Sequence, residues 1–228
     1  MLILENNPKP VAAESYRTLR TNIQYSSFDN PVKSIVITSS EPGEGKSTTS
    51  ANLALSFAQD GKKVILIDCD LRKPSIHENF LLANEKGLTD VLFGKSDLKG
   101  VTKKIEDSLF LITAGTILPN PAEILGSKEM ENLIKELKIN FDYIIIDTPP
   151  ILPVSDTLLL VSKADATLIV VKARKTKEKM VKESYERLIE AKANVIGTVL
   201  NESDKSLDNK YCGNYGDGKN KKGKIFNK

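Results

Sequence analysis

Two glycines, a lysine and a serine follow a run of mostly β-branched residues early in the chain. Residues 35–38 read Ile-Val-Ile-Thr, and residues 39–48 read Ser-Ser-Glu-Pro-Gly-Glu-Gly-Lys-Ser-Thr before a helical pattern begins. Glycine lets backbone N–H groups turn inward, and N–H groups at a helix N-terminus attract phosphate oxygens. The order and spacing of these residues therefore predict a phosphate-binding loop between a strand and a helix.

Side chains and backbone groups of this loop have expected roles. Lys46 would reach the β- and γ-phosphates of a nucleotide, and the Ser47 hydroxyl would bind Mg²⁺, a hard cation that prefers oxygen. The other expected nucleotide contacts of the loop are Gly43, Glu44, Gly45 and Thr48. The motif usually begins with glycine, whereas Ser40 holds that place here. A glycine-rich turn without a ligand is the alternative.

Aspartates end two further apolar runs. Residues 64–67 lead into Asp68 and Asp70, two carboxylates two residues apart, and residues 143–146 lead into Asp147. The carboxyl ends of parallel strands are where doubly wound folds bind ligands. Asp147 would support Mg²⁺ beside the loop. Asp68 or Asp70 would accept the proton of an attacking hydroxyl or hold the metal. The alternative for this pair is a turn capped by aspartate side chains.

The elements that must position these groups alternate along the chain. We expect strands at 32–38, 64–68, 109–113, 143–147, 166–172 and 195–200, and helices at 12–25, 47–59, 87–92, 122–137, 156–163 and 177–193. The continuous apolar run at 64–67 is typical of a central parallel strand covered on both faces. The pattern predicts an α/β fold, P-loop NTPase-like, with a mostly parallel sheet and helices on both faces.

Composition limits the other possibilities. The 228 residues, 40% hydrophobic and 28% charged, suit one domain over 1–203 and a tail over 204–228 that is lysine-rich and should be flexible. The body has no basic patch of the size that nucleic-acid binding requires. No apolar run is long enough to span a bilayer, and no signal-peptide pattern is present. We therefore expect a cytoplasmic protein without a nucleic-acid partner.

Together these motifs resemble the bacterial tyrosine kinases of capsular and exopolysaccharide synthesis, in the form whose kinase is a separate cytosolic chain (CapB-like). The resemblance covers almost the whole chain. It is carried by residues 14–22, by the loop at 39–48 with serine in first place, by Ile65–Pro74 with the pattern I-D-x-D-x-R-x-P, and by residues 120–125 and 144–150.

The resemblance implies an ATP- and Mg²⁺-dependent protein tyrosine kinase. Its catalytic residues would be Lys46, Asp68, Asp70 and Asp147, and its metal-binding residues Ser47, Asp68 and Asp147. Asn201 would contact adenine. Tyr211 and Tyr215 would be phosphorylated in trans by a neighbouring subunit; without the resemblance, they are incidental residues of a linker.

The resemblance also implies partners. Glu14, Arg17 and Arg20 recur every three residues on the expected helix at 12–25. In the family this motif joins subunits into a ring, an octamer, whereas spacing alone fits an exposed face with an ordinary Glu–Arg pair. Further implied partners are a membrane-anchored polysaccharide co-polymerase activator (CapA-like), which would recruit the kinase to the inner face of the cell membrane, and a cognate tyrosine phosphatase.

Two rival functions remain on the residues alone. A partition-type ATPase of the same superfamily would carry a second lysine early in the loop, where Glu41 stands here, and would lack tail tyrosines. A nucleotide-binding scaffold would control polysaccharide export by assembling and disassembling without phosphorylating tyrosine.

Overall fold

The computed structural model describes residues 2, 10–26, 31–117 and 119–203, so Tyr211, Tyr215 and the expected tail lie outside the described residues. The described residues form a seven-stranded sheet in the order β3-β4-β2-β5-β1-β6-β7. All neighbouring strands are parallel except β3 and β4, which are antiparallel. The expectation of a mostly parallel α/β sheet is confirmed.

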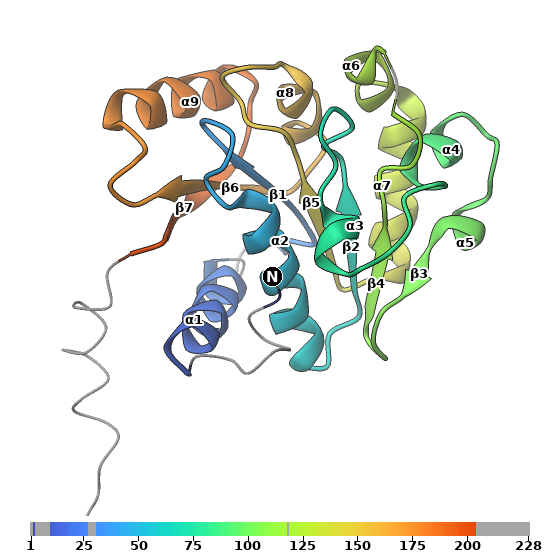
Figure 1. The fold of residues 1–228 in the computed structure, drawn as a ribbon, viewed down its shortest axis with the longest axis horizontal. Coiled ribbons are helices and arrows are strands. Elements are labelled where there is room, and N and C mark those ends of the chain that lie inside the picture. The colour runs from blue at the N-terminus through green and yellow to red at the C-terminus, as the bar shows by residue number, and fades with distance from the viewer. Residues whose placement is uncertain (1, 3–9, 27–30, 118, 204–228) are drawn as a thin grey trace, which may run out of the picture.

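The strands and helices alternate along the chain (Figure 1). The strands are β1 Ser34–Ser39, β2 Val64–Asp68, β3 Lys103–Lys104, β4 Leu109–Ile112, β5 Tyr143–Asp147, β6 Ala166–Lys172 and β7 Val195–Asn201. The helices are α1 Pro10–Ser26, α2 Lys46–Gln59, α3 Ile76–Asn79, α4 Leu88–Leu92, α5 Leu98–Val101, α6 Pro121–Leu125, α7 Lys128–Asn140, α8 Asp156–Val161 and α9 Glu178–Glu190. None of these described helices is both long and apolar enough to cross a lipid bilayer.

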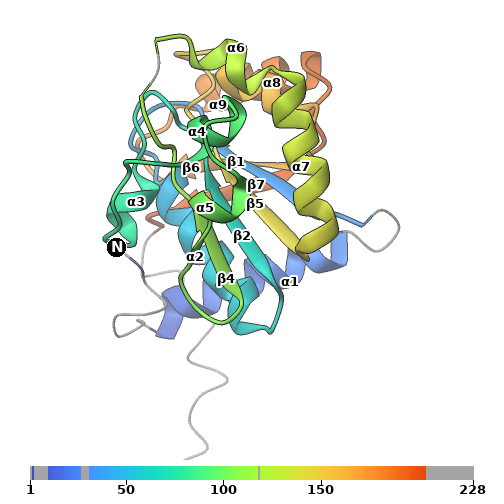
Figure 2. The same cartoon turned by 90° about the vertical axis from the view of Figure 1, so that its right-hand side faces the viewer.

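Helices cover both faces of the sheet, and Figure 2 shows α2 and α7 on opposite sides of the central strands. Successive residues of β2 point to opposite faces: Val64 and Leu66 pack in the core with α1 and α2, whereas Ile65 and Ile67 pack in the core with α7, α8 and α9. All four side chains are fully buried. The apolar run therefore forms a central strand covered on both faces, as expected.

One expected helix is wrong in its extent. The stretch at 122–137 is two helices, α6 and α7, which meet at Gly126 and Ser127. The Ser127 hydroxyl accepts a hydrogen bond from the Met130 N–H at 3.2 Å and so caps α7. A cap within an apolar-periodic stretch ends one helix and starts the next. The short antiparallel β3 was also not expected, because two lysines carry no strand signal.

Candidate active site

Parallel register brings the predicted carboxylates to the same edge of the sheet. Asp68 and Asp147 end β2 and β5 and are register partners, and the Cys69 N–H donates to the Asp147 carbonyl at 2.8 Å. The next strand, β1, leads into the loop that joins it to α2 (Figure 1). The loop and the acidic residues thus meet at the carboxyl ends of three adjacent strands, where doubly wound folds bind ligands.

The loop has the backbone that its glycines predict. Gly43 and Gly45 have φ angles of 79° and 93°, in the left-handed region that favours glycine. A Cβ on Gly45 would also lie 1.9 Å from the Asn201 amide nitrogen, so no larger residue fits there. Helix α2 begins at Lys46, and its first N–H groups have no acceptor within the helix. They are available to a phosphate.

Ser40, which stands where the motif usually has its first glycine, contacts α9. The Ser184 hydroxyl donates to the Ser40 hydroxyl at 2.9 Å, and the Ser40 hydroxyl donates to the Met180 carbonyl at 3.4 Å. Ser40 and Ser184 are fully buried. Ser40 therefore links the start of the loop to α9.

Glu44 closes the loop on itself. One carboxylate oxygen accepts hydrogen bonds from the N–H groups of Ser40 at 2.8 Å and Glu41 at 3.1 Å. The other accepts one from the Thr176 hydroxyl. The Asn201 amide nitrogen donates to the Glu44 carbonyl at 3.0 Å. These bonds fix the conformation of the loop and place Asn201, the expected adenine contact, directly beside it.

The Lys46 ammonium lies among oxygen atoms. It is 2.8 Å from Asp70 Oδ2, 3.2 Å from the Ser47 hydroxyl and 3.9 Å from Asp147 Oδ2. Burial lowers the pKa of Lys46, but the charges of Asp147 and Asp70 outweigh burial and raise it above its ordinary value. The ammonium is therefore charged at neutral pH and is held at the end of the loop.

Asp147 meets the requirement for a magnesium-supporting residue. It is fully buried, and one carboxylate oxygen accepts a hydrogen bond from the Ser50 hydroxyl at 2.9 Å. The other, Oδ2, is buried without a hydrogen-bond partner. Burial raises the pKa of Asp147, while Lys46 and the Ser47 hydroxyl oppose the rise. A buried oxygen of this kind, beside a serine hydroxyl, fits Mg²⁺, which uses one or two carboxylates together with phosphates and water.

Asp68 and Asp70 have different environments. Asp68 accepts hydrogen bonds from the N–H groups of Asp70, Ser75 and Ile76 at 3.0–3.1 Å, so it does cap the turn after β2. Burial and the charge of Asp147 raise the pKa of Asp68 to about 8. Asp70 instead binds Lys46 and accepts a hydrogen bond from the Lys73 N–H at 3.0 Å. Asp68 therefore stabilises the turn after β2, and both carboxylates belong to the acidic group beside the loop.

An ion pair that the sequence did not reveal holds this turn. Arg72 Nε lies 2.7 Å from Asp156 Oδ2 and Arg72 Nη2 3.0 Å from Oδ1. Asp156, the first residue of α8, is fully buried. Arg72 belongs to the I-D-x-D-x-R-x-P pattern, but nothing in the sequence singles out its partner. Ser50 and Thr176, which bind Asp147 and Glu44, were missed for the same reason.

Helix α1 divides the three residues of the expected interface. Arg17 and Glu14 form an exposed ion pair of 3.0 Å. Arg20 turns inward, where it donates to the Ser56 carbonyl at 2.7 Å and lies 3.3 Å from Asp60 Oδ1. Both acceptors belong to or border α2. Arg20 therefore attaches α1 to the helix that begins at the phosphate loop.

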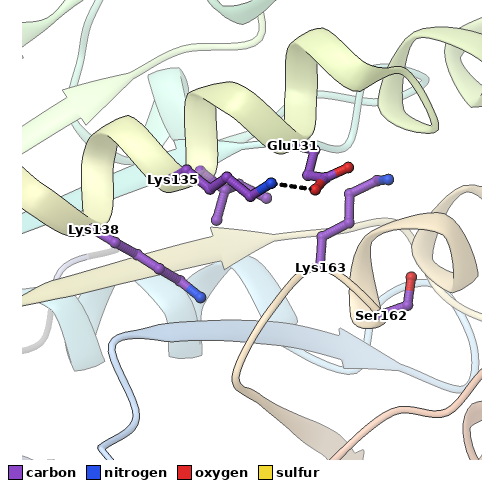
Figure 3. A pocket seen from close by; sticks show the side chains of 6 residues that line it. Glu131, Lys135, Lys138, Ser162 and Lys163 are labelled. Carbon is purple, nitrogen blue, oxygen red and sulfur yellow. Dashed lines mark hydrogen bonds and ion pairs between the residues drawn. The ribbon is translucent and has the colours of Figure 1, made fainter.

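A separate hollow of about 390 Å³ lies between α7 and the turn after α8 (Figure 3). It is lined by Glu131, Ile134, Lys135, Lys138, Ser162 and Lys163. Lys135 pairs with Glu131, and Lys138 pairs with Asp165, whose carboxylate also binds the Ser34 N–H at the amino end of β1. The hollow lies at the end of the sheet opposite to the loop and forms no part of the candidate active site.

The chain is similar to known proteins both in sequence and in structure. Residues 32–201 match a family model described as an AAA domain. The chain therefore belongs to the class of phosphate-loop nucleotide-binding proteins. It is 46% identical over 216 residues to the tyrosine-protein kinase YwqD of Bacillus subtilis (strain 168), covering 94% of this chain and 91% of the relative. It is 40% identical over 212 residues to the tyrosine-protein kinase CpsD of Streptococcus pneumoniae, covering 90% and 92%.

These relatives show the family: the chain belongs to the bacterial tyrosine kinases. Among solved structures, it is similar to the chimerical protein CapA2B2, with a TM-score of 0.85, 38% identity and 90% of each chain covered. The resemblance drawn from the sequence motifs is thereby confirmed.

Proposed function

We propose that this chain transfers the γ-phosphoryl group of ATP to tyrosine, and that its acceptors are Tyr211 and Tyr215 of a neighbouring copy. The bond between the γ-phosphorus and the oxygen bridging to ADP breaks, and a bond to the phenolic oxygen forms. The phenolic proton passes to Asp70, because Asp68 is assigned to the metal. The observation that carries this proposal is the Lys46 ammonium, held within 2.8–3.9 Å of Asp70, Ser47 and Asp147 at the end of the loop.

The residues of the site have separate tasks. The first N–H groups of α2 and the Lys46 ammonium bind and neutralise the phosphates. Ser47, Asp147 and Asp68 would hold Mg²⁺, which would neutralise charge that develops during transfer. The remaining carboxylate faces the acceptor. Asn201, anchored to the loop through Glu44, contacts adenine. Positioning and charge neutralisation supply most of the catalysis in phosphoryl transfer.

Membership of this family also supports a proposal about how copies of the chain assemble. Glu14 and Arg17 are 62% and 46% exposed and are available to a second copy, so we propose that they form the ring interface, with an octamer as the expected size. The similarity to CapA2B2 supports a membrane-anchored CapA-like activator that recruits the kinase to the inner face of the membrane. In this setting the kinase regulates capsular or exopolysaccharide synthesis and export, and a tyrosine phosphatase reverses it.

The test is mass spectrometry of the full chain after incubation with Mg-ATP, with and without the cytosolic segment of a candidate activator. We expect phosphate on Tyr211 or Tyr215 in the wild type and none in Lys46→Met. Lys99→Met, which removes an exposed lysine of α5, is the matched control and should behave as the wild type. ATP hydrolysis without phosphotyrosine in either condition would instead support the ATPase or scaffold.

A further inference from the structure

A second lysine lies against the phosphate loop, on the side away from the aspartates. Lys175 belongs to the turn between β6 and α9. Its ammonium nitrogen is 3.8 Å from the position that a Cβ on Gly43 would occupy. The corresponding position on Gly45 is taken by the Asn201 amide. The two loop glycines are thus covered by polar groups from the turn after β6 and from the end of β7.

The turn that carries Lys175 is held in place. Its neighbour Thr176 donates a hydrogen bond through its hydroxyl to the Glu44 carboxylate, and the same hydroxyl accepts one from the Lys172 N–H at 3.0 Å. The N–H groups of Lys175 and Thr176 both donate to the Lys172 carbonyl. Because the backbone is fixed to the loop, less ordering is needed for the ammonium to meet a ligand there.

The strand order gives the loop two different flanks. On one side of β1 lies β5 and then β2, with Asp147, Asp68 and Asp70 at their ends; on the other side lie β6 and β7. Lys46 points to the acidic flank. The phosphoryl group that is transferred must lie at that flank. A nucleotide bound along the loop therefore places its nucleoside, and the phosphate next to it, at the flank of Lys175 and Asn201.

We propose that Lys175 is a second phosphate-binding lysine, which contacts the nucleoside-side phosphate of a bound adenine nucleotide. This inference rests on the proposed function, because it requires a nucleotide in the loop. Lys46 and Lys175 then hold the two ends of the polyphosphate from opposite flanks. Lys175 is an exposed residue, so its replacement should leave the fold intact and change nucleotide affinity alone.

The experiment is calorimetric titration of ADP and ATP into the wild type, Lys175→Ala, Lys175→Arg and Lys177→Ala. A charged hydrogen bond at a partly solvated site predicts affinities for both nucleotides that are about 5- to 10-fold weaker in Lys175→Ala. Lys175→Arg should recover most of the loss because it keeps the charge. Lys177→Ala removes an exposed lysine two residues further on and should match the wild type.

Three results would overturn the inference. Lys175→Ala could bind ADP within about twofold of the wild type, which is below the loss expected for a charged contact. Lys177→Ala could lose as much nucleotide affinity as Lys175→Ala, which would indicate that only the general positive charge of this turn matters. A loss confined to ATP would place the lysine at the γ-phosphate. Failure of the wild type to bind ADP at all would instead overturn the proposed function, so the two failures are distinguishable.

Discussion

The ammonium of Lys46 lies 2.8 Å from Asp70 Oδ2, and the two side chains are only 11% and 5% exposed. The lysine that would bind the phosphates of a nucleotide is therefore paired with a carboxylate of its own chain. Solvent and salt screen such a buried pair far less than a surface pair. An incoming phosphate must compete with Asp70 for the ammonium, and its own negative charge is repelled by the same carboxylate.

Asp70→Asn should therefore separate nucleotide binding from catalysis. Without Mg²⁺, the variant should bind ADP more tightly, by about 3- to 10-fold, because a neighbouring negative charge is removed. With Mg²⁺ and ATP, its tyrosine phosphorylation should fall, because the carboxylate near the acceptor is lost. Calorimetry in EDTA and a phosphorylation time course measure the two effects.

The control for this variant is Asp107→Asn, which neutralises a fully exposed carboxylate and should change neither quantity. Weaker ADP binding by Asp70→Asn in EDTA would contradict the prediction. It would mean that the carboxylate orients Lys46 for the phosphates and does not compete with them.

The ion pair between Arg72 and Asp156 should stabilise the turn that carries Asp70. Asp156 is fully buried, whereas Arg72 is 44% exposed, so the pair is worth less than a fully buried one. We expect Arg72→Ala to lower the free energy of unfolding by about 1–3 kcal/mol, because it leaves a buried carboxylate unpaired. Urea unfolding of the wild type and the variant measures this difference.

Arg72→Lys should restore only part of that stability, since an ammonium cannot reproduce the two parallel hydrogen bonds of the guanidinium. Asp156→Asn, combined with Arg72→Ala, should be more stable than Arg72→Ala alone, because no buried charge then remains. If Arg72→Ala unfolds at the same urea concentration as the wild type, the pair does not contribute to stability.

Much of the site could be predicted from the sequence because its signals are local. The loop at 39–48 and the aspartate that follows each apolar run are read directly from adjacent residues. Parallel strands end at the same edge, so the proximity of Asp68 and Asp147 also follows. Their register confirms that these two residues lie side by side.

The remaining contacts could not be predicted because they join distant parts of the chain. Arg72 and Asp156 are 84 residues apart, and Glu44 and Thr176 are 132 apart. The directions of the side chains on α1 could not be predicted from the sequence either. A three-residue spacing places Glu14, Arg17 and Arg20 on one broad face of a helix, but that face is wide enough for Arg20 to reach α2 while the other two point to solvent.

This division of α1 predicts different effects for its two arginines. Arg20→Ala should lower the free energy of unfolding by about 1–2 kcal/mol, because it removes the bonds to Ser56 and Asp60. Arg17→Ala should change it by less than about 0.5 kcal/mol, because an exposed ion pair contributes little. Urea unfolding of the isolated subunit gives both values.

The effects of the two arginines on assembly should have the opposite order to their effects on stability. If Glu14 and Arg17 face a second copy, Arg17→Ala should reduce the ring to smaller species in analytical ultracentrifugation while its unfolding stays unchanged. A ring of unaltered mass in Arg17→Ala would remove this residue from the interface. Lys182→Ala, on the exposed face of α9, serves as the control for general charge.

The raised pKa of Asp68 predicts that magnesium binding depends on pH. Burial and the charge of Asp147 raise this pKa to about 8, so in the folded protein the carboxyl group keeps its proton up to nearly that pH. A metal requires the carboxylate, so binding must release the proton. The apparent affinity of the ADP complex for Mg²⁺ should therefore rise by up to about tenfold per pH unit between about pH 6 and pH 8, and level off above.

Magnesium titrations of the ADP complex at several pH values test this prediction, with two variants that separate Asp68 from the phosphates of ADP. Asp68→Asn should bind Mg²⁺ more weakly and lose most of the pH dependence, since only the nucleotide still titrates. Asp147→Asn removes the neighbouring negative charge, so the pKa of Asp68 should fall and the pH dependence should move to lower pH. An affinity of the wild type that stays constant across this range would show that Asp68 does not bind the metal, and would leave it the role of capping the turn before Ile76.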